Sequence, residues 1–481
     1  MANSIVEVYS SLREIQDALL TGELTCVSLV EGYLKAIEHK KHLNIYLEVY
    51  AEEAISRAKE IDRKIKTGTQ GELAGMVVGL KDVFCYKDHH LQASSKILDN
   101  FVSQFDATCV NKMLMQDAII IGRINCDEFA MGSSNENSAF GPVLNDIAND
   151  RVPGGSSGGS AVAVQAGTCL VALGSDTGGS VRQPASFTGT IGMKPTYGRI
   201  SRYGLIAYAS SFDTVGIISK SIEDNARTLS VIAGADEYDS TVSKKEVAQY
   251  HKSLNRKGKI KRVAYIRETL NHEGLNEEIR ENVLETVASL KENGHLVEET
   301  EFPYLDYVLP TYYILTTAEA SSNLSRYDGV RYGYRSNNVT DLESLFKKSR
   351  SEGFGDEVKR RILLGTFVLS ASYYDAYYTK AQKARRVIKE KTEELLKDFE
   401  YIILPTSPTV AFKLGQKSNP LEMYLADLYT VQASVSGLPA ISIPNGVDHQ
   451  GLPIGLQIIG RHFDEEGLYA FANEILEYDK N

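Results

Sequence analysis

The chain of 481 residues is expected to adopt an α/β fold in which helices are layered against a central sheet. Residues 75–80 and 118–123 are short, continuously apolar runs, typical of strands that are covered on both faces. Residues 106–117 and 159–173 have the spacing of helices. Helices that alternate with buried strands indicate an α/β architecture. With 43% hydrophobic and 24% charged residues, the composition is that of a globular protein with a large core.

The first segment, residues 8–66, is expected to be helical. Apolar side chains such as Val30 and Leu34 fall close to helical spacing, while Lys and Glu occupy the other face. We therefore predict a helical N-terminal cover at residues 1–66 and one compact unit at residues 67–481.

Polar residues dominate the segment 237–258, which we predict to be a surface loop or insertion. A strand at residues 261–266 and a helix at residues 276–293 are expected to follow. Gly294 stands where a glycine commonly ends a helix.

The last part of the chain combines a long helical pattern with further strands. The pattern covers residues 356–399 and is interrupted near Gly365. Apolar runs at residues 401–404, 440–443 and 454–459 are predicted strands. The sequence contains no internal repeat and no long linker, which favours one compact unit.

The charge balance limits the possible roles of the protein. Lys and Arg number 52 against 63 Asp and Glu, a net charge of −11. Non-specific binding to nucleic acid or anionic membranes needs a cationic surface, so neither is expected as the main role. No apolar run reaches the ~18 residues of a membrane span, and the N-terminus resembles neither a signal nor a transit peptide. We expect a soluble, cytoplasmic protein.

The cysteines are odd in number and form no CxxC pair, which indicates free thiols in a reducing compartment and no zinc site. They are Cys26, Cys85, Cys109, Cys126 and Cys169.

Two loops rich in glycine and serine are the clearest chemical signal. Residues 152–160 and 174–184 place Ser156 and Ser180 24 positions apart, and Lys81 ends an apolar strand upstream. A nucleophilic serine needs a base, a proton route and donors for the oxyanion. Ser180 can attack, Ser156 can relay the proton and Lys81 can accept it when neutral.

The second loop can also supply the oxyanion donors. The backbone N–H groups of Thr177, Gly178, Gly179 and Ser180 are expected to face the oxyanion, because two glycines let a carbonyl oxygen approach closely. Asp176 is expected to hold this loop by hydrogen bonds.

Other interpretations of these segments remain open. The first loop can be a flexible linker or a capped helix start, and Lys81 can be a surface lysine paired with Asp82. A neutral lysine requires a shift of its pKa from ~10.4 to ~7, which costs about 4–5 kcal/mol. A phosphate loop would need a GK[ST] lysine that is missing, and the GxSxG elbow is absent too. The nine histidines form no consistent rival triad.

Together, these segments closely resemble the amidase signature family, whose Ser–Ser–Lys machinery matches Lys81, Ser156 and Ser180. The resemblance implies a central mixed sheet covered by helices on both faces, with the catalytic domain at residues 67–481. It also implies a cis peptide bond between Gly155 and Ser156.

Later segments resemble one branch of that family, the glutaminase subunits of bacterial tRNA-dependent amidotransferases. These segments are residues 126–134, 319–332, 358–362, 373–378 and 423–427. The resemblance implies a glutamine site formed by Tyr312, Arg361, Asp427, Met131 and Gly132. An arginine suits the α-carboxylate of a free amino acid, and an aspartate suits its α-ammonium group.

The resemblance further implies a glutaminase that passes ammonia to a partner B subunit. That subunit uses ATP and Mg²⁺ to convert Glu-tRNA(Gln) to Gln-tRNA(Gln), and a small C subunit clamps the pair in a heterotrimer. The present chain is expected to need no metal or cofactor of its own. The alternatives are a stand-alone amidase acting on another small carboxamide, and a non-catalytic subunit kept for assembly.

Overall fold

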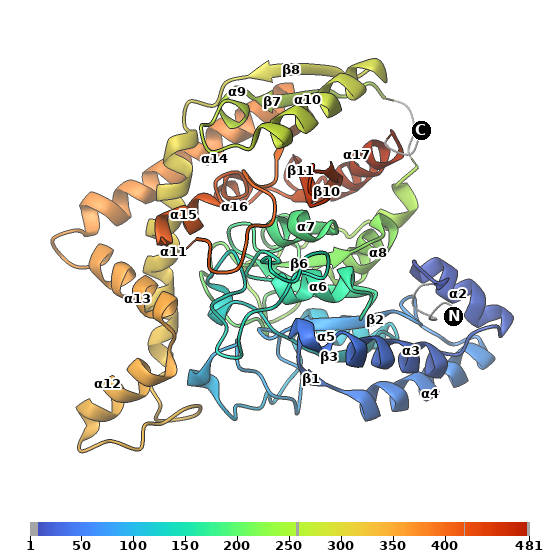
Figure 1. Ribbon diagram of the computed structural model, residues 1–481, viewed down its shortest axis with the longest axis horizontal. Helices are drawn as coiled ribbons and strands as arrows, with labels where there is room; N and C mark the ends of the chain where they lie inside the picture. The colour runs from blue at the N-terminus through green and yellow to red at the C-terminus, as the bar shows by residue number, and fades with distance from the viewer. Residues whose placement is uncertain (1–7, 256–258, 418, 479–481) are drawn as a thin grey trace.

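The computed structural model describes residues 8–255, 259–417 and 419–478. Its centre is an eleven-stranded mixed sheet covered by helices on both faces (Figure 1), which confirms the predicted α/β class. The strand order is β1-β3-β2-β4-β6-β5-β10-β11-β9-β7-β8. No helix within the described ranges is long and apolar enough to cross a membrane.

The strands are β1 (Tyr46–Val49), β2 (Val77–Lys81), β3 (Ile119–Ile124), β4 (Val171–Asp176), β5 (Ile191–Lys194), β6 (Thr214–Ser219), β7 (Arg262–Ile266), β8 (Leu296–Thr300), β9 (Tyr401–Pro405), β10 (Ala440–Val447) and β11 (Pro453–Ile459). Strand β2 is parallel to β3 and β4, and β7 is parallel to β8 and β9. The strands from β4 through β6, β5, β10 and β11 to β9 pair antiparallel.

The α-helices are α2 (Leu12–Thr21), α3 (Cys26–His39), α4 (Ala51–Thr67), α5 (Thr108–Met115), α6 (Gly158–Gln165), α7 (Arg182–Thr188), α8 (Ile222–Ile232), α9 (Arg267–Leu270), α10 (Glu277–Glu292), α11 (Leu305–Asn323), α12 (Leu342–Gly353), α13 (Asp356–Val368), α14 (Lys380–Asp398), α15 (Pro420–Leu425), α16 (Val431–Ser436) and α17 (Glu465–Tyr478). Short helical turns, η1 to η6, span Lys41–Leu43, Lys96–Leu98, Glu128–Ala130, Tyr250–Ser253, Leu324–Arg326 and Tyr374–Thr379.

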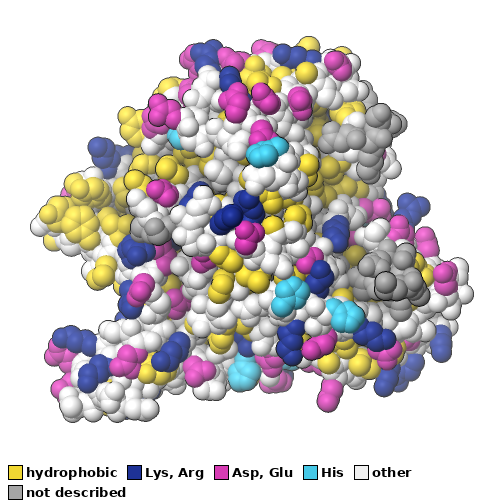
Figure 2. Space-filling model, viewed as in Figure 1, with side chains coloured by type: hydrophobic (Ala, Val, Ile, Leu, Met, Phe, Trp, Pro, Cys, Tyr) yellow, Lys and Arg dark blue, Asp and Glu magenta, His cyan; other side chains and the backbone are white. Residues whose placement is uncertain are grey.

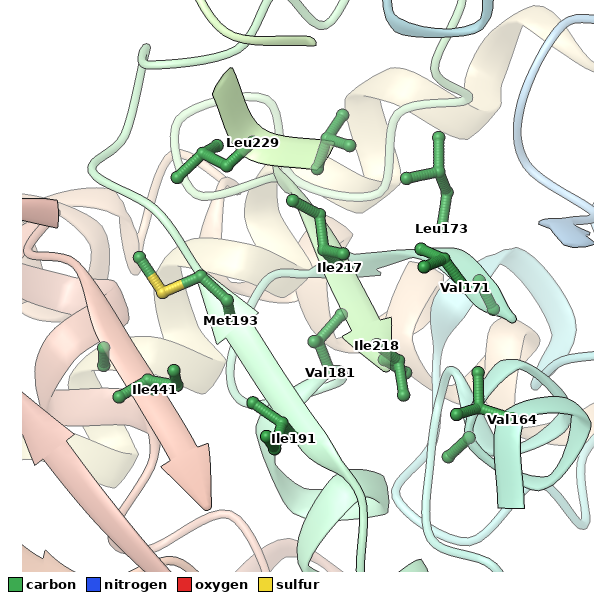
Figure 3. Close-up of a cluster of buried hydrophobic side chains, with 14 of the residues drawn as sticks. Val164, Val171, Leu173, Val181, Ile191, Met193, Ile217, Ile218, Leu229 and Ile441 are labelled. Carbon is green, nitrogen blue, oxygen red and sulfur yellow. The ribbon is translucent and has the colours of Figure 1, made fainter. Parts of the chain in front are cut away.

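The core is continuous through the middle of the sheet. Figure 3 shows side chains from β4, β5 and β6 meeting those of α6, α8 and β10, among them Val171, Met193, Ile217 and Ile441. β4 and β6 are buried along their whole length because helices pack on them. Their central residues are therefore apolar without alternation, and polar residues stand only at the strand ends, such as Ser175 and Asp176 in β4.

The N-terminal segment packs directly on this sheet. Its helices begin at capping residues, since Ser11 accepts the N–H of Glu14 and Thr25 forms a capping box with Ser28. Residues 46–49, predicted to be helical with the rest of 8–66, instead form β1, which pairs antiparallel with β3. The sequence of β1 includes the polar residue Glu48, which suits a strand at the edge of the sheet.

Two further sequence expectations need correction. The helix predicted at 159–173 ends at Gln165, and the β-branched residue Val171 already begins β4. Gly365 lies inside α13 rather than at a break. A side chain there would collide with the Thr317 carbonyl of α11, so the glycine allows the two helices to pack closely. The helical pattern is interrupted further on, at residues 369–373.

The segment 237–258 has little regular structure, as expected of a loop, apart from the turn η4. Tyr250 in that turn is buried and accepts hydrogen bonds from Arg199, so this part of the loop is anchored. Residues 256–258 lie outside the described residues.

Candidate active site

Lys81 lies at the end of β2 with its side chain fully buried. Its Nζ donates to three hydroxyl groups: Ser156 at 2.8 Å, Ser157 at 2.9 Å and Ser175 at 2.9 Å. Ser156 and Ser157 precede α6, and Ser175 is in β4, the strand next to β2. The sheet therefore brings the predicted base against the predicted relay serine.

The surroundings of Lys81 favour its neutral form. Burial lowers the pKa of this lysine to about 8, although nearby acidic groups, including Asp127 and Asp176, oppose the shift. A substantial fraction of Lys81 is consequently neutral near physiological pH, as a proton acceptor must be.

The Ser156 turn is fixed by backbone hydrogen bonds. The peptide bond between Gly155 and Ser156 is cis. The Gly155 N–H donates to Gln183 Oε1 at 2.9 Å, and the Asp127 N–H donates to the Ser156 carbonyl at 3.1 Å. The Ser157 N–H donates to the Ser180 carbonyl at 3.0 Å, so the two serine loops contact each other directly.

Asp176 shapes the turn that carries Ser180. Its carboxylate accepts the N–H groups of Gly179 at 2.9 Å and Val181 at 3.2 Å, and pairs with Arg182 through two nitrogens. Burial alone would raise the pKa of Asp176, but the Arg182 guanidinium lowers it overall. Asp176 thus holds the loop, as the sequence suggested.

This arrangement reduces the number of backbone N–H groups in the turn that are free to bind the oxyanion. The N–H of Gly179 is already directed at Asp176, whereas those of Gly178 and Ser180 have no protein partner among the described residues. A side chain at Gly178 would collide with the phenol ring of Tyr312, so this tyrosine lies directly over the turn.

Arg361 projects from α13 and is 3% exposed. Its Nε donates to Glu357 at 2.8 Å and its Nη1 donates to the Tyr208 hydroxyl at 2.8 Å. Its guanidinium carbon lies 5.4–5.5 Å from the ring centres of Tyr208, Tyr313 and Tyr424. These contacts fix the guanidinium and leave Nη2 without a protein partner among the described residues.

Asp427 follows α15 and contacts the same aromatic group. It accepts a hydrogen bond from the Tyr313 hydroxyl at 2.7 Å and another from Ser133 at 2.8 Å. Burial raises its pKa to about 6, so it is mostly ionised at neutral pH. Tyr313 therefore contacts both Arg361 and Asp427, which places opposite charges around one aromatic side chain.

Met131 and Gly132 lie between two residues that contact the site, Asp127 and Ser133. Met131 is fully buried, and a side chain at Gly132 would collide with the Asp127 carboxyl group. The next residue, Ser133, binds Asp427. The structure thus brings Lys81 against Ser156, Tyr312 against the turn of Ser180, and Arg361 and Asp427 against Tyr313. The roles of Met131 and Gly132 stay predictions.

Sequence reasoning did not assign a role to several residues that contact Lys81, Arg361 or Asp427. They are Ser133, Ser157, Ser175, Tyr208, Tyr313, Glu357 and Tyr424. Ser157 and Ser175 stand in the two glycine-serine segments, so their position was a usable signal. Tyr313 is one of 27 tyrosines and nothing in its local pattern distinguishes it.

The site is enclosed. Ser180 is 8% exposed and Asp427 is 7% exposed, so side chains that would meet a substrate are almost entirely covered. Within the part of the chain that the structure describes, no group of three or more His, Cys, Asp or Glu side chains could hold a metal ion.

A buried lysine that contacts a serine hydroxyl, next to a glycine turn bearing a second serine, defines the class of serine hydrolases in which lysine replaces histidine as the base. The comparisons specify the class further. The family model described as Amidase matches residues 28–469, so the chain belongs to the amidase family.

Curated relatives match over nearly the whole chain. The A subunit of glutamyl-tRNA(Gln) amidotransferase from Chlorobium phaeobacteroides is 50% identical over 466 residues, 96% of this chain and 98% of that protein. The protein of the same name from Fusobacterium nucleatum is 48% identical and covers 97% of both chains.

Solved structures agree with the fold. The A subunit of glutamyl-tRNA(Gln) amidotransferase from Thermotoga maritima is 38% identical with a TM-score of 0.77, covering 96% of this chain and 94% of that one. A bacterial aryl acylamidase, 21% identical with a TM-score of 0.85, covers 98% of this chain and 96% of its own, and shows the fold alone.

Proposed function

We propose that this chain is the glutaminase component of a glutamyl-tRNA(Gln) amidotransferase, equivalent to the A subunit of its relatives. The observation that carries the choice of glutamine is the pair Arg361 and Asp427, both buried and both in contact with Tyr313. Two fixed, opposite charges beside a nucleophile suit a zwitterionic amino acid, since each bound charge would be desolvated and needs a partner. The names of the relatives at about 50% identity support the same assignment.

In the proposed reaction, neutral Lys81 takes a proton from Ser156, which takes one from Ser180. A neutral amine keeps two hydrogens and one lone pair. Ser157 and Ser175 can accept the two hydrogens, which leaves the lone pair for the Ser156 proton.

Ser180 then attacks the side-chain amide of glutamine and forms a γ-glutamyl ester. The oxyanion of the tetrahedral intermediate is stabilised by N–H groups of the turn, those of Thr177, Gly178 and Ser180. The protonated relay returns its proton to the leaving nitrogen, which departs as ammonia. Water hydrolyses the ester and regenerates Ser180.

The ammonia released at this site must be used in a second reaction. We infer a cytoplasmic complex with B and C subunits, in which ATP and Mg²⁺ are used to activate Glu-tRNA(Gln). An exposed aromatic group at the turn between α13 and α14 supports a partner, because contiguous apolar surface usually marks an interaction site. It consists of Phe367, Tyr373, Tyr374 and Tyr377, each about 40% exposed. Figure 2 shows hydrophobic side chains gathered at this end of the molecule.

The deciding experiment replaces the nucleophile. Ser180→Ala in the complete complex should abolish ammonia release from glutamine, because no ester can form, while amidation supplied with free ammonium should continue. Both activities are measured with ATP, Mg²⁺ and Glu-tRNA(Gln). Loss of the ammonium-supported reaction as well would contradict the division of labour between subunits.

The wild-type chain alone provides the control for a stand-alone amidase. Low glutamine hydrolysis without partners and a large rise in the full mixture are expected. Brisk hydrolysis of uncharged amides that does not respond to partners would instead identify a stand-alone enzyme.

A further inference from the structure

Two consecutive carboxylates follow β3 and bind different parts of the site. Asp127 accepts the N–H groups of Asn135 at 2.9 Å and Asn137 at 3.1 Å, and its own N–H donates to the Ser156 carbonyl. Asp127 therefore belongs to the proton-relay side of the site. The next residue, Glu128, has no part in the proposed chemistry, although its carboxylate is buried.

Glu128 binds the start of α13. Its side chain is almost fully buried, and both carboxylate oxygens accept the N–H of Gly355, at 3.1 and 2.9 Å. The Ser95 hydroxyl donates a further hydrogen bond to the same carboxylate. Gly355 is the N-cap residue of α13 and no side chain of that segment caps the helix. Burial raises the pKa of the Glu128 carboxyl group to about 7. Glu128 therefore supplies hydrogen-bond acceptor oxygens at a helix N-terminus that has no local cap.

The contact depends on a glycine at the cap. A side chain at Gly355 would collide with the Glu128 carboxylate, so the backbone approaches this group as closely as it can. Phe129 reinforces the junction, since its ring packs against Phe354 and Tyr327 at centre distances of 5.7 and 5.0 Å. Its φ of 50° turns the chain sharply after Glu128.

Arg361 lies six residues beyond Gly355, about 9 Å along the axis of α13. Its guanidinium is held by Glu357 of the same helix and by Tyr208, which precedes β6. Its position therefore depends on how α13 is set against the segment of Tyr208. A small rotation or slide of the helix would move the guanidinium relative to Asp427 and Ser180, which are on other elements.

We propose that Glu128 is a positioning residue for substrate recognition: by fixing the first turn of α13, it sets where Arg361 meets the substrate carboxylate. The proposal rests on the proposed role of Arg361 in binding glutamine. The two consecutive carboxylates then have different functions. Asp127 stabilises the loop of the relay serine, and Glu128 contributes to the affinity for glutamine.

The test is steady-state glutamine hydrolysis by the complete complex carrying Glu128→Ala. We expect the KM for glutamine to rise at least tenfold and kcat to stay within about threefold of the wild type, because the relay is untouched. Glu128→Gln keeps an acceptor oxygen and should give a smaller rise. Ammonium-supported amidation should be unchanged in both variants, which verifies assembly.

A matched control uses Glu268, which accepts the Phe302 N–H through both oxygens at 2.9 Å, away from α13. Glu268→Ala should leave the KM for glutamine unchanged. If the Glu128→Ala chain does not assemble into the complex, the KM of the Glu128→Gln complex is the test. An unchanged KM for glutamine in that variant overturns the proposal.

A double-mutant cycle shows whether Glu128 acts through Arg361. Arg361→Ala should raise the KM, and adding Glu128→Ala should raise it no further. If the two substitutions raise the KM by factors that multiply in the double variant, Glu128 does not act through Arg361 and the positioning role is overturned. The proposed glutamine site would be unaffected by that result. An unchanged KM in Arg361→Ala itself would instead contradict the proposed glutamine site.

Discussion

At the scale of single residues, the ionisation of Lys81 controls the proposed reaction. Burial lowers its pKa to about 8, and only the neutral amine can take the Ser156 proton. We therefore expect kcat/KM for glutamine to rise with pH and to level off above about pH 8. Lys81 alone should reduce it at pH 6 to about one-hundredth of the plateau, since two pH units separate pH 6 from the pKa of Lys81. Protonation of Asp427, whose pKa is about 6, should lower it further. Initial rates of ammonia release across pH 5.5–9.5 measure this profile.

Two serine variants test whether Lys81 is the group that titrates in this pH profile. Ser175 accepts a hydrogen bond from Lys81, and such a bond stabilises the ammonium form. Ser175→Ala should thus move the rising limb to lower pH. Ser160→Ala should not, because its hydroxyl donates to the Leu173 carbonyl instead. A profile that is flat from pH 6 to 9 would exclude Lys81 as the base.

At the scale of elements, the turn between β4 and α7 depends on glycine. Gly179 has a φ of 137°, and a side chain there would collide with Thr430. Gly179→Ala should therefore displace the turn and its N–H donors. We expect kcat for glutamine hydrolysis to fall about 10²–10³-fold, the usual effect of losing an oxyanion donor.

Gly294→Ala is the matched control for that variant. Gly294 also has a positive φ, 89°, but no atom lies within 4 Å of the added carbon. It should cost about 1 kcal/mol of the free energy of unfolding, seen in denaturant titration, with no change in kcat. An equal fall in kcat for both variants would show that strain alone, rather than the turn, explains the effect.

The sequence predicted elements well where one signal dominated. Strands β2, β3, β7, β9, β10 and β11 and helix α10 lie where expected, because each is a mainly apolar run or a clear helical repeat. The sequence pattern does not separate strand β4 from the end of the preceding helix, since a buried strand and a buried helix have the same apolar composition when no alternation is present. The Lys81 and Ser156 contact could be anticipated from the loops, whereas Tyr313 and Glu128 act through contacts with distant segments, which local patterns do not encode.

At the scale of the whole molecule, residues 8–66 are covalently and structurally continuous with the sheet that holds Lys81. Strand β1 pairs with β3, and β3 pairs with β2. The N–H of Leu12 donates to the buried Asp224 of α8. A side chain at Gly75 would collide with Ile15 and Leu19, so α2 fits closely against the segment before β2. The predicted boundary between an N-terminal cover at residues 1–66 and a catalytic unit at residues 67–481 remains a proposal. Because of these contacts, deletion of residues 1–66 tests it.

Removal of residues 1–66 should leave a chain that does not fold cooperatively. The deletion strips buried apolar side chains from the main core, including Leu12, Ile15, Leu29 and Ile61. Each is worth about 1.5–3 kcal/mol, so a handful exceeds the 5–15 kcal/mol by which a typical domain is stable. Thermal unfolding followed by circular dichroism measures this, with Ile15→Ser expected to lower the midpoint and Leu20→Ser, at a position 65% exposed, to leave it unchanged. A fragment 67–481 that melts cooperatively at the temperature of the whole chain would instead make the N-terminal segment a separable cover, and the edge of the sheet at β3 would then be stable without β1.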